Sequence, residues 1–184
     1  MTALAGARAS RLRRWLVWAA GFLAFPIAGL AGTGVAGLVI GVGQTLASLG
    51  RLDVRRWLPA TGVGMGLGLL LGAVTVGYGT SLADLALMGA LTGLVLGPAQ
   101  ALALPHGTRL RWLWAVAMPA LWALGWTATT LGGIAVDEQF TVFGAYGAVT
   151  FSALSGLLLL LLLPDHPAAG SPMTPAPAPS EARA

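Results

Sequence analysis

The sequence predicts an all-α polytopic membrane protein with six transmembrane helices, arranged as three parallel helical-hairpin repeats. Composition gives the class, because 57% of the 184 residues are hydrophobic and only 9% are charged. A soluble domain of this size needs far more polar surface. The length of the apolar runs indicates transmembrane helices, since crossing roughly 30 Å of hydrocarbon takes about 20 apolar residues in a helix. Four runs meet that length: 57–77, 85–104, 112–132 and 140–163.

The apolar region 15–49 must contain a reversal of the chain. As a single helix its 35 residues would be about 52 Å long, well beyond the thickness of a bilayer. The small-residue segment 29–34, which follows Pro26, is the predicted turn, and it leaves two arms of roughly 16 residues each. Because these arms are short, the sequence leaves open whether 15–49 forms two full spans or a short hairpin.

Charge placement fixes the expected topology. All ten basic residues are Arg, and nine fall into three clusters: Arg8, Arg11, Arg13 and Arg14; Arg51, Arg55 and Arg56; Arg109 and Arg111. By the positive-inside rule all three clusters lie in the cytoplasm, so an even number of spans separates each from the next. The connectors 77–84 and 133–139 carry no Arg and hold Asp84, Asp137 and Glu138, which places them outside. Six spans with both termini in the cytoplasm satisfy this pattern.

Three regions follow along the chain. Residues 1–14 form an Arg-rich cytoplasmic N-terminus, 15–163 the six-helix transmembrane domain, and 164–184 a disordered Pro- and Ala-rich cytoplasmic tail. A chain without Lys but rich in Ala, Gly, Leu and Arg is typical of a GC-rich bacterial genome, so the expected location is the bacterial inner membrane. The alternative for the N-terminus is a cleaved signal peptide, with small residues around 29–31 at its end.

An internal repeat divides the domain. The phrase "GLVIGVGQTLAS" begins at Gly37 and "GLVLGPAQALAL" begins at Gly93, which pairs Gln44 with Gln100 at an offset of 56 residues. Each copy is followed by an Arg-containing loop that leads into a Trp-initiated helix. The predicted hairpins are therefore 15–49, 57–104 and 112–163, and the returning helix of the third has no Gln. Since each unit holds two spans, successive units enter the membrane in the same orientation and are parallel repeats.

Helical spacing places each glutamine on a stripe of small residues. Positions i, i+4 and i+7 share a face, which predicts a helix-packing seam made of Gly37 and Gly41 in one copy and Gly93 and Gly97 in the other. A polar side chain on such a seam faces protein and not lipid. Gln44 and Gln100 are thus interpreted as interhelical contacts that donate to neighbouring backbone carbonyls, each worth roughly 0.6–2 kcal/mol. The alternative is that they line a polar vestibule that contacts a ligand.

The repeated phrase, basic loop and following Trp resemble a group of small, uncharacterised bacterial multi-pass membrane proteins. Their repeats read approximately G-x-x-x-G-x-x-Q-W-L-x-L, and the similarity covers most of residues 14–163. This chain departs from that pattern after each glutamine, where Thr45 and Ala101 stand in place of Trp. The resemblance implies a multi-pass membrane fold and brings no biochemical activity with it.

Groups for catalysis or metal binding are scarce. There is no Cys, and His106 and His166 have no second His or carboxylate at ligand spacing, so no catalytic residue, metal site or cofactor is predicted. The central parts of the predicted spans lack Asp, Glu, Lys and Arg, which argues against proton-driven transport. Ser81 and Asp84 form the S-x-x-D pattern of a helix N-terminal capping box.

Tryptophans mark two regions. Five lie near Arg at the inner ends of spans and are interpreted as an interfacial belt at headgroup level: Trp15, Trp18, Trp57, Trp112 and Trp114. In the outer half of the span 112–132, Trp126 precedes the hydroxyl-bearing segment from Thr127 to Thr130. Core or lipid-facing packing is the expected role there, and Trp126, Thr127 and Thr130 are the candidates for a polar lining.

Two function classes fit these features. The favoured hypothesis is a non-enzymatic integral membrane protein that serves in membrane assembly or partner binding, with the lipid bilayer, other membrane proteins or copies of itself as partners. The alternative is a small pore or facilitator for an uncharged solute, lined by Gln44, Gln100 and the Thr127–Thr130 face. No nucleic-acid partner is expected, because the short Arg clusters flank spans and are explained by topology and anionic headgroups.

Overall fold

The computed structural model describes residues 2–136 and 142–163, and within these ranges every regular element is a helix. The tail 164–184 and the predicted outer charges Asp137 and Glu138 lie outside the described residues. In chain order the elements are α1 (Thr2–Ala20), the 3-10 turn η1 (Gly21–Leu23), α2 (Ala24–Ala31), α3 (Thr33–Ala47), α4 (Val54–Val76), α5 (Leu82–Ala103), α6 (Arg111–Leu131) and α7 (Ala145–Leu162). The predicted all-α class is confirmed.

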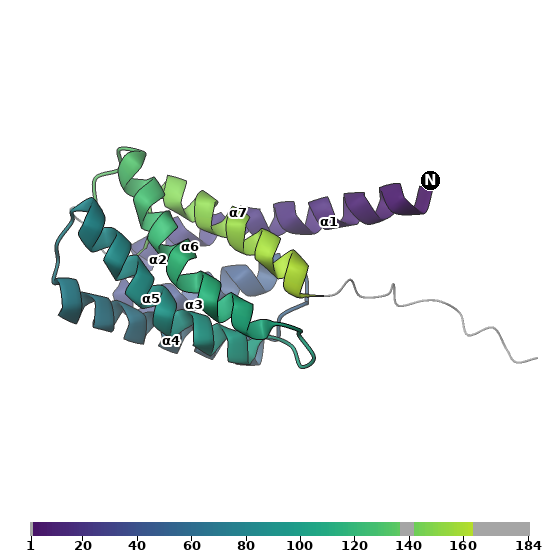
Figure 1. Ribbon diagram of the computed structural model, residues 1–184, viewed down its shortest axis with the longest axis horizontal. Coiled ribbons are helices and arrows are strands. Elements are labelled where there is room, and N and C mark those ends of the chain that lie inside the picture. The colour runs from purple at the N-terminus through teal and green to yellow at the C-terminus, as the bar shows by residue number, and fades with distance from the viewer. Residues whose placement is uncertain (1, 137–141, 164–184) are drawn as a thin grey trace, which may run out of the picture.

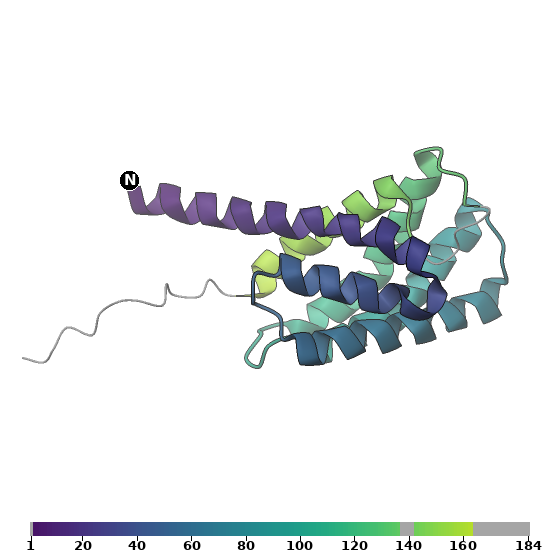
Figure 2. The same cartoon turned by 180° about the vertical axis from the view of Figure 1, so that it is seen from behind.

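The helices form a bundle in which each one packs beside its neighbour in sequence (Figures 1 and 2). Helix α1, η1 and α2 follow one another as a single rod, and α1 also packs against α7, which closes the bundle. We call α1 to α3 the first hairpin, α4 with α5 the second, and α6 with α7 the third.

Four helical segments in the described part are long and apolar enough to cross a membrane: Ala5–Ala31, Val54–Val76, Leu82–Ala103 and Ala145–Leu162. Six spans therefore stay a prediction. Helix α3 falls short in length, because its apolar stretch is Val35–Ala47. Helix α6 has 21 residues but carries Arg111, several Thr and several Trp, which make it less apolar than its neighbours.

The first hairpin reverses at Gly32, inside the segment where the sequence predicts the turn. Gly32 has φ +81° and separates α2 from α3. This backbone conformation is open to Gly because it has no Cβ, whereas other L-residues are strained there. A glycine at this position thus lets two short apolar arms return side by side.

All three arginine clusters lie at one end of the bundle (Figures 1 and 2). We call this the arginine-rich end; it comprises residues 2–14 of α1, the connections 48–53 and 104–110, and the first turns of α4 and α6. The opposite end holds the connections 77–81 and 132–136. There the predicted cap on α5 is confirmed, because Ser81 Oγ accepts from the Asp84 N–H at 3.2 Å and donates to Asp84 Oδ2 at 2.7 Å.

The helix starts differ from the predicted ones. Helix α1 begins at Thr2, so residues up to Arg14 belong to the same helix as Trp15 and are not a separate segment. Its residues 5–13 are exposed, and this part projects beyond the rest of the bundle (Figure 2). Helix α4 begins at Val54, before Trp57, because Asp53 Oδ1 accepts from the Arg55 N–H at 2.9 Å and caps the first turn.

Candidate functional site

The structure brings the two repeated glutamines together inside the bundle. Gln44 lies in the last turn of α3 and Gln100 in the last turn of α5, and they are 6% and 0% exposed. Gln100 Nε2 donates to Gln44 Oε1 at 3.3 Å and to Thr61 Oγ1 of α4 at 3.0 Å. The bond between the two glutamines joins the first hairpin to the second near the arginine-rich end, and the bond to Thr61 joins α5 to α4 within the second hairpin.

Two buried tryptophans complete this cluster. Trp57 Nε1 donates to Gln44 Oε1 at 2.9 Å, and Trp114 Nε1 donates to Gln100 Oε1 at 3.0 Å. Both indoles are 0% exposed, and their rings meet edge to face with centroids 5.8 Å apart. Each glutamine oxygen therefore accepts from the first helix of the following hairpin. We call Gln44, Gln100, Thr61, Trp57 and Trp114 the indole–amide network.

A third contact of the same kind joins the last hairpin to the first. Trp18 Nε1 of α1 donates to Ser155 Oγ of α7 at 3.1 Å, and both side chains are buried. Trp18 also packs edge to face on Trp114, with ring centroids 6.4 Å apart. Ser155 thus provides the acceptor on the returning helix that has no Gln.

The two glycine seams explain how the helices approach closely enough for these bonds. A Cβ on Gly37 of α3 would lie 3.0 Å from Gly62 Cα of α4, and one on Gly41 would lie 3.3 Å from Thr61 Cβ. A Cβ on Gly93 of α5 would lie 2.6 Å from Pro119 N of α6, and one on Gly97 would lie 3.0 Å from Ala115 Cα. Small residues at these positions let the backbones touch.

Burial corrects the interpretation of the tryptophans as an interfacial belt. Trp57 and Trp114 are 0% exposed and Trp18 is 4% exposed, whereas an indole at headgroup level would keep much of its surface outside the protein. Trp15 is half-buried and donates from Nε1 to Ala153 O at 2.9 Å, and Trp112 keeps an exposed ring, at 55%. The physical reason is that buried amide and hydroxyl oxygens need donors, and an indole N–H supplies one together with a large apolar surface.

The predicted polar lining on α6 does not join the network. Thr127 Oγ1 donates to Ala123 O at 2.9 Å and Thr130 Oγ1 to Trp126 O at 3.1 Å, so both hydroxyls bond to their own helix. Trp126 is 0% exposed and packs against Phe143, with ring centroids 5.4 Å apart. Along the α6 axis these residues lie about 18 to 24 Å from Trp114, because each residue adds 1.5 Å.

The separation between glutamine and tryptophan along the chain is the sequence signal for the buried role of Trp57 and Trp114. Trp57 follows Gln44 by 13 residues and Trp114 follows Gln100 by 14. The predicted 56-residue offset pairs Arg55 with Arg111 and so sets Trp57 opposite Leu113. The spacing from glutamine to indole is one residue longer in the second copy, and Trp114 occupies the buried position. The glutamines were also expected to donate to backbone carbonyls, whereas Gln100 donates to two side chains and both glutamine oxygens accept from indoles.

The arrangement offers hydrogen bonding and packing in place of reactive groups. None of the network residues is ionisable, and in residues 2–136 and 142–163 no group of three His, Cys, Asp or Glu side chains could hold a metal ion. Comparisons with protein-family models, curated proteins and solved structures find no match for this chain.

Proposed function

We propose that the chain is a six-span protein of the bacterial inner membrane, built from three parallel hairpin repeats, that acts in membrane assembly or partner binding and not as an enzyme. The pattern of contacts between hairpins carries this proposal. In each case a Trp on the first helix of one hairpin donates to a polar side chain on the returning helix of the preceding hairpin. Such regularity is expected when equivalent units surround a common axis near the membrane normal.

The separation of charge supports the proposed orientation. The arginine-rich end carries all the described Arg residues, while the opposite end carries Asp84. Basic residues near span ends remain in the cytoplasm during insertion. Both termini are therefore cytoplasmic in the proposal, and the α1–η1–α2 rod and the shorter α3 cross the membrane as the two arms of the first hairpin.

The projecting part of α1 supports a role in binding. Residues 5–13 are exposed and extend past the other helices at the arginine-rich end. A helix segment of this length is marginal in water by itself and gains most of its stability from packing. Its exposed Arg8 gives it positive charge, which suits an acidic segment of another membrane protein or of a second copy.

The facilitator hypothesis has less support. Gln44 and Gln100, its proposed lining, bond to each other and to indoles, and Gln100 has no exposed surface. The Thr127 and Thr130 hydroxyls bond to carbonyls of their own helix. A solute that entered here would have to break these contacts.

Cross-linking in the native membrane, combined with flux assays, tests the proposed function. A photo-reactive residue at Ala9 on the projecting part of α1 should give one discrete adduct, either with another membrane protein or with a second copy. The matched control is Ala83, which is exposed at the opposite end of the bundle and should give none. Absence of an Ala9 adduct, together with flux of a small uncharged solute into liposomes that hold the purified protein, would favour the facilitator.

A further inference from the structure

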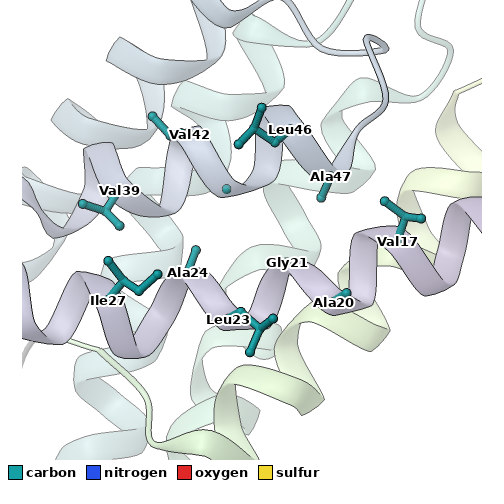
Figure 3. Close-up of a pocket in the computed structure, with 11 residues that line it drawn as sticks. Val17, Ala20, Gly21, Leu23, Ala24, Ile27, Val39, Val42, Leu46 and Ala47 are labelled. Atoms are coloured by element: carbon teal, nitrogen blue, oxygen red, sulfur yellow. The ribbon is translucent and has the colours of Figure 1, made fainter.

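An open apolar groove of about 590 Å³ runs between the α1–η1–α2 rod and α3 (Figure 3). Its walls include Leu23 and Ile27 on the rod and Val42 and Leu46 on α3, which are 56%, 58%, 44% and 73% exposed. These side chains face outward from the bundle. The groove is therefore open to whatever surrounds the protein in the membrane.

Small residues form the floor of the groove and cause its shape. A Cβ on Gly43 would lie 2.5 Å from Ala24 Cβ, and one on Gly21 would lie 3.3 Å from Ala47 Cβ. The rod and α3 thus touch along this line, while the larger side chains stand on either side of it. Helix crossings at small residues bring backbones close in this way.

The length and position of the groove fit one leaflet. Along the rod it extends from Val17 to Ile27, which is about 15 Å at 1.5 Å per residue, or half of the roughly 30 Å hydrocarbon core. One end is formed by Val17 and by Ala47, the last residue of α3, so the groove opens toward the arginine-rich end. A single acyl chain, which extends through one leaflet, matches this length.

A positive charge stands at that mouth. Arg13 is exposed and lies one helical turn before Val17 on the same face of α1. Within the last turn of α3, Ser48 N–H donates to Gln44 O at 2.9 Å, Ser48 Oγ to Thr45 O at 2.7 Å and Leu49 N–H to Leu46 O at 3.2 Å. The mouth therefore presents an exposed cation to an incoming headgroup.

We propose that this groove binds one acyl chain of an anionic phospholipid of the cytoplasmic leaflet, whose phosphate is held by Arg13. The assignment to the cytoplasmic leaflet rests on the orientation given under the proposed function. The chain fills the apolar groove between the rod and α3, and the headgroup lies where Arg13 leaves the hydrocarbon. Selectivity for anionic over zwitterionic lipid comes from this arginine, because a net negative headgroup is attracted to it.

Lipid titration of the purified full chain tests the proposal. Phosphatidylglycerol and phosphatidylcholine with the same acyl chains are added in a nonionic detergent, and bound lipid is counted by native mass spectrometry. One phosphatidylglycerol should be retained in preference to phosphatidylcholine. Arg13→Gln should weaken phosphatidylglycerol binding about fivefold with little effect on phosphatidylcholine. Ala20→Phe, which places a ring in the groove from an exposed position, should weaken binding of both lipids.

Two matched variants serve as controls. Arg109→Gln removes an exposed charge from another connection at the same end, and Ala120→Phe adds a ring at an exposed position of α6. Both should bind lipid like the unmodified chain. Equal retention of the two lipids by the unmodified chain, or equal effects of Arg13→Gln and Arg109→Gln, would overturn the proposal.

Two further experiments test for other occupants of the groove. Competition by soluble glycerol 3-phosphate at the concentration of the lipid would show an anion site that does not use the groove, which contradicts the proposal. Disulfide-linked dimers of a Val42→Cys variant would show that a second copy covers the groove, with the same consequence. Since the titration uses the isolated protein, its result does not depend on the proposed partner, and cysteine labelling measures the orientation separately.

Discussion

The side chain of Gln100 forms hydrogen bonds with three other side chains. Its oxygen accepts from Trp114, and its nitrogen donates to Gln44 and Thr61. All of these groups are buried in an apolar bundle, where a polar atom that loses its partner keeps the cost of its desolvation. The amide therefore matters chiefly through the partners that its removal would leave unsatisfied.

Replacing the glutamines by leucine should destabilise the bundle unequally. Gln100→Leu leaves the Trp114 N–H without its acceptor and should lower the free energy of unfolding by about 1–3 kcal/mol. Gln44→Leu likewise leaves the buried Trp57 N–H without its acceptor, but it breaks two side-chain hydrogen bonds where Gln100→Leu breaks three, so it should cost somewhat less, about 1–2 kcal/mol. The double variant should cost less than the sum, since the two amides share a hydrogen bond.

Equilibrium unfolding in mixed micelles measures these values. Unchanged stability in both single variants would contradict a packing role and would favour the facilitator if solute flux changed at the same time. If the double variant lost as much free energy of unfolding as the two single variants together, the Gln44–Gln100 bond would contribute little.

At the scale of elements, the α5–α6 crossing is the closest approach along the glycine seams. The atoms that a Cβ on Gly93 would meet belong to the α6 backbone at Met118 and Pro119. Backbone atoms in a helix cannot move aside without moving the helix. On Gly37 the nearest atoms, Gly62 Cα and Met65 Cβ, are both 3.0 Å away and need a smaller shift.

Gly93→Ala should therefore destabilise the protein by about 1–3 kcal/mol, and by more than Gly37→Ala. Gly66→Ala is the matched control, because a Cβ there would meet nothing within 4 Å, and it should be neutral or stabilise by up to about 1 kcal/mol. Thermal unfolding of the three variants in one detergent compares them. Equal melting temperatures for Gly93→Ala and Gly66→Ala would show that the crossing is looser than described.

Helical periodicity was sufficient to place the glycine seams and the glutamines on faces that pack against protein. It could not separate Trp57 and Trp114 from Trp112, because all three follow Arg at the start of a helix. Which indole turns inward depends on the length of the connection, 13 against 14 residues from glutamine to tryptophan, and on the rotation of each helix about its axis. The apolar pattern of a single segment does not determine the connection length or the helix rotation.

For the whole molecule, hydropathy and charge predicted the helical class, the turn near Gly32 and the grouping of Arg at one end. The start of α1 at Thr2 was missed, because four Arg between residues 8 and 14 interrupt the apolar pattern before Trp15. The sequence also could not show whether α6 faces lipid or protein, since its tryptophans and threonines suit a buried helix as well as an interfacial one.

Single cysteines should report the orientation of the molecule, and the chain has no native Cys to interfere. Val54→Cys and Arg109→Cys lie at the arginine-rich end and Thr80→Cys lies at the opposite end, all at exposed positions. In intact spheroplasts a membrane-impermeant maleimide should label the variant at position 80 and spare the other two until the cells are lysed. Labelling of positions 54 or 109 in intact cells would reverse the proposed topology.

The most direct test of the whole account is the energetic coupling between Trp114 and Gln100, since bonds of this kind are proposed to join the hairpins. In a double-mutant cycle of Trp114→Phe and Gln100→Leu, unfolding should give a coupling of about 0.6–1.7 kcal/mol. The same cycle with Trp112→Phe, at the exposed tryptophan on the same helix, should give a coupling near zero. Equal coupling in the two cycles, or none in the first, would contradict the claim that indole–amide hydrogen bonds hold the hairpins together.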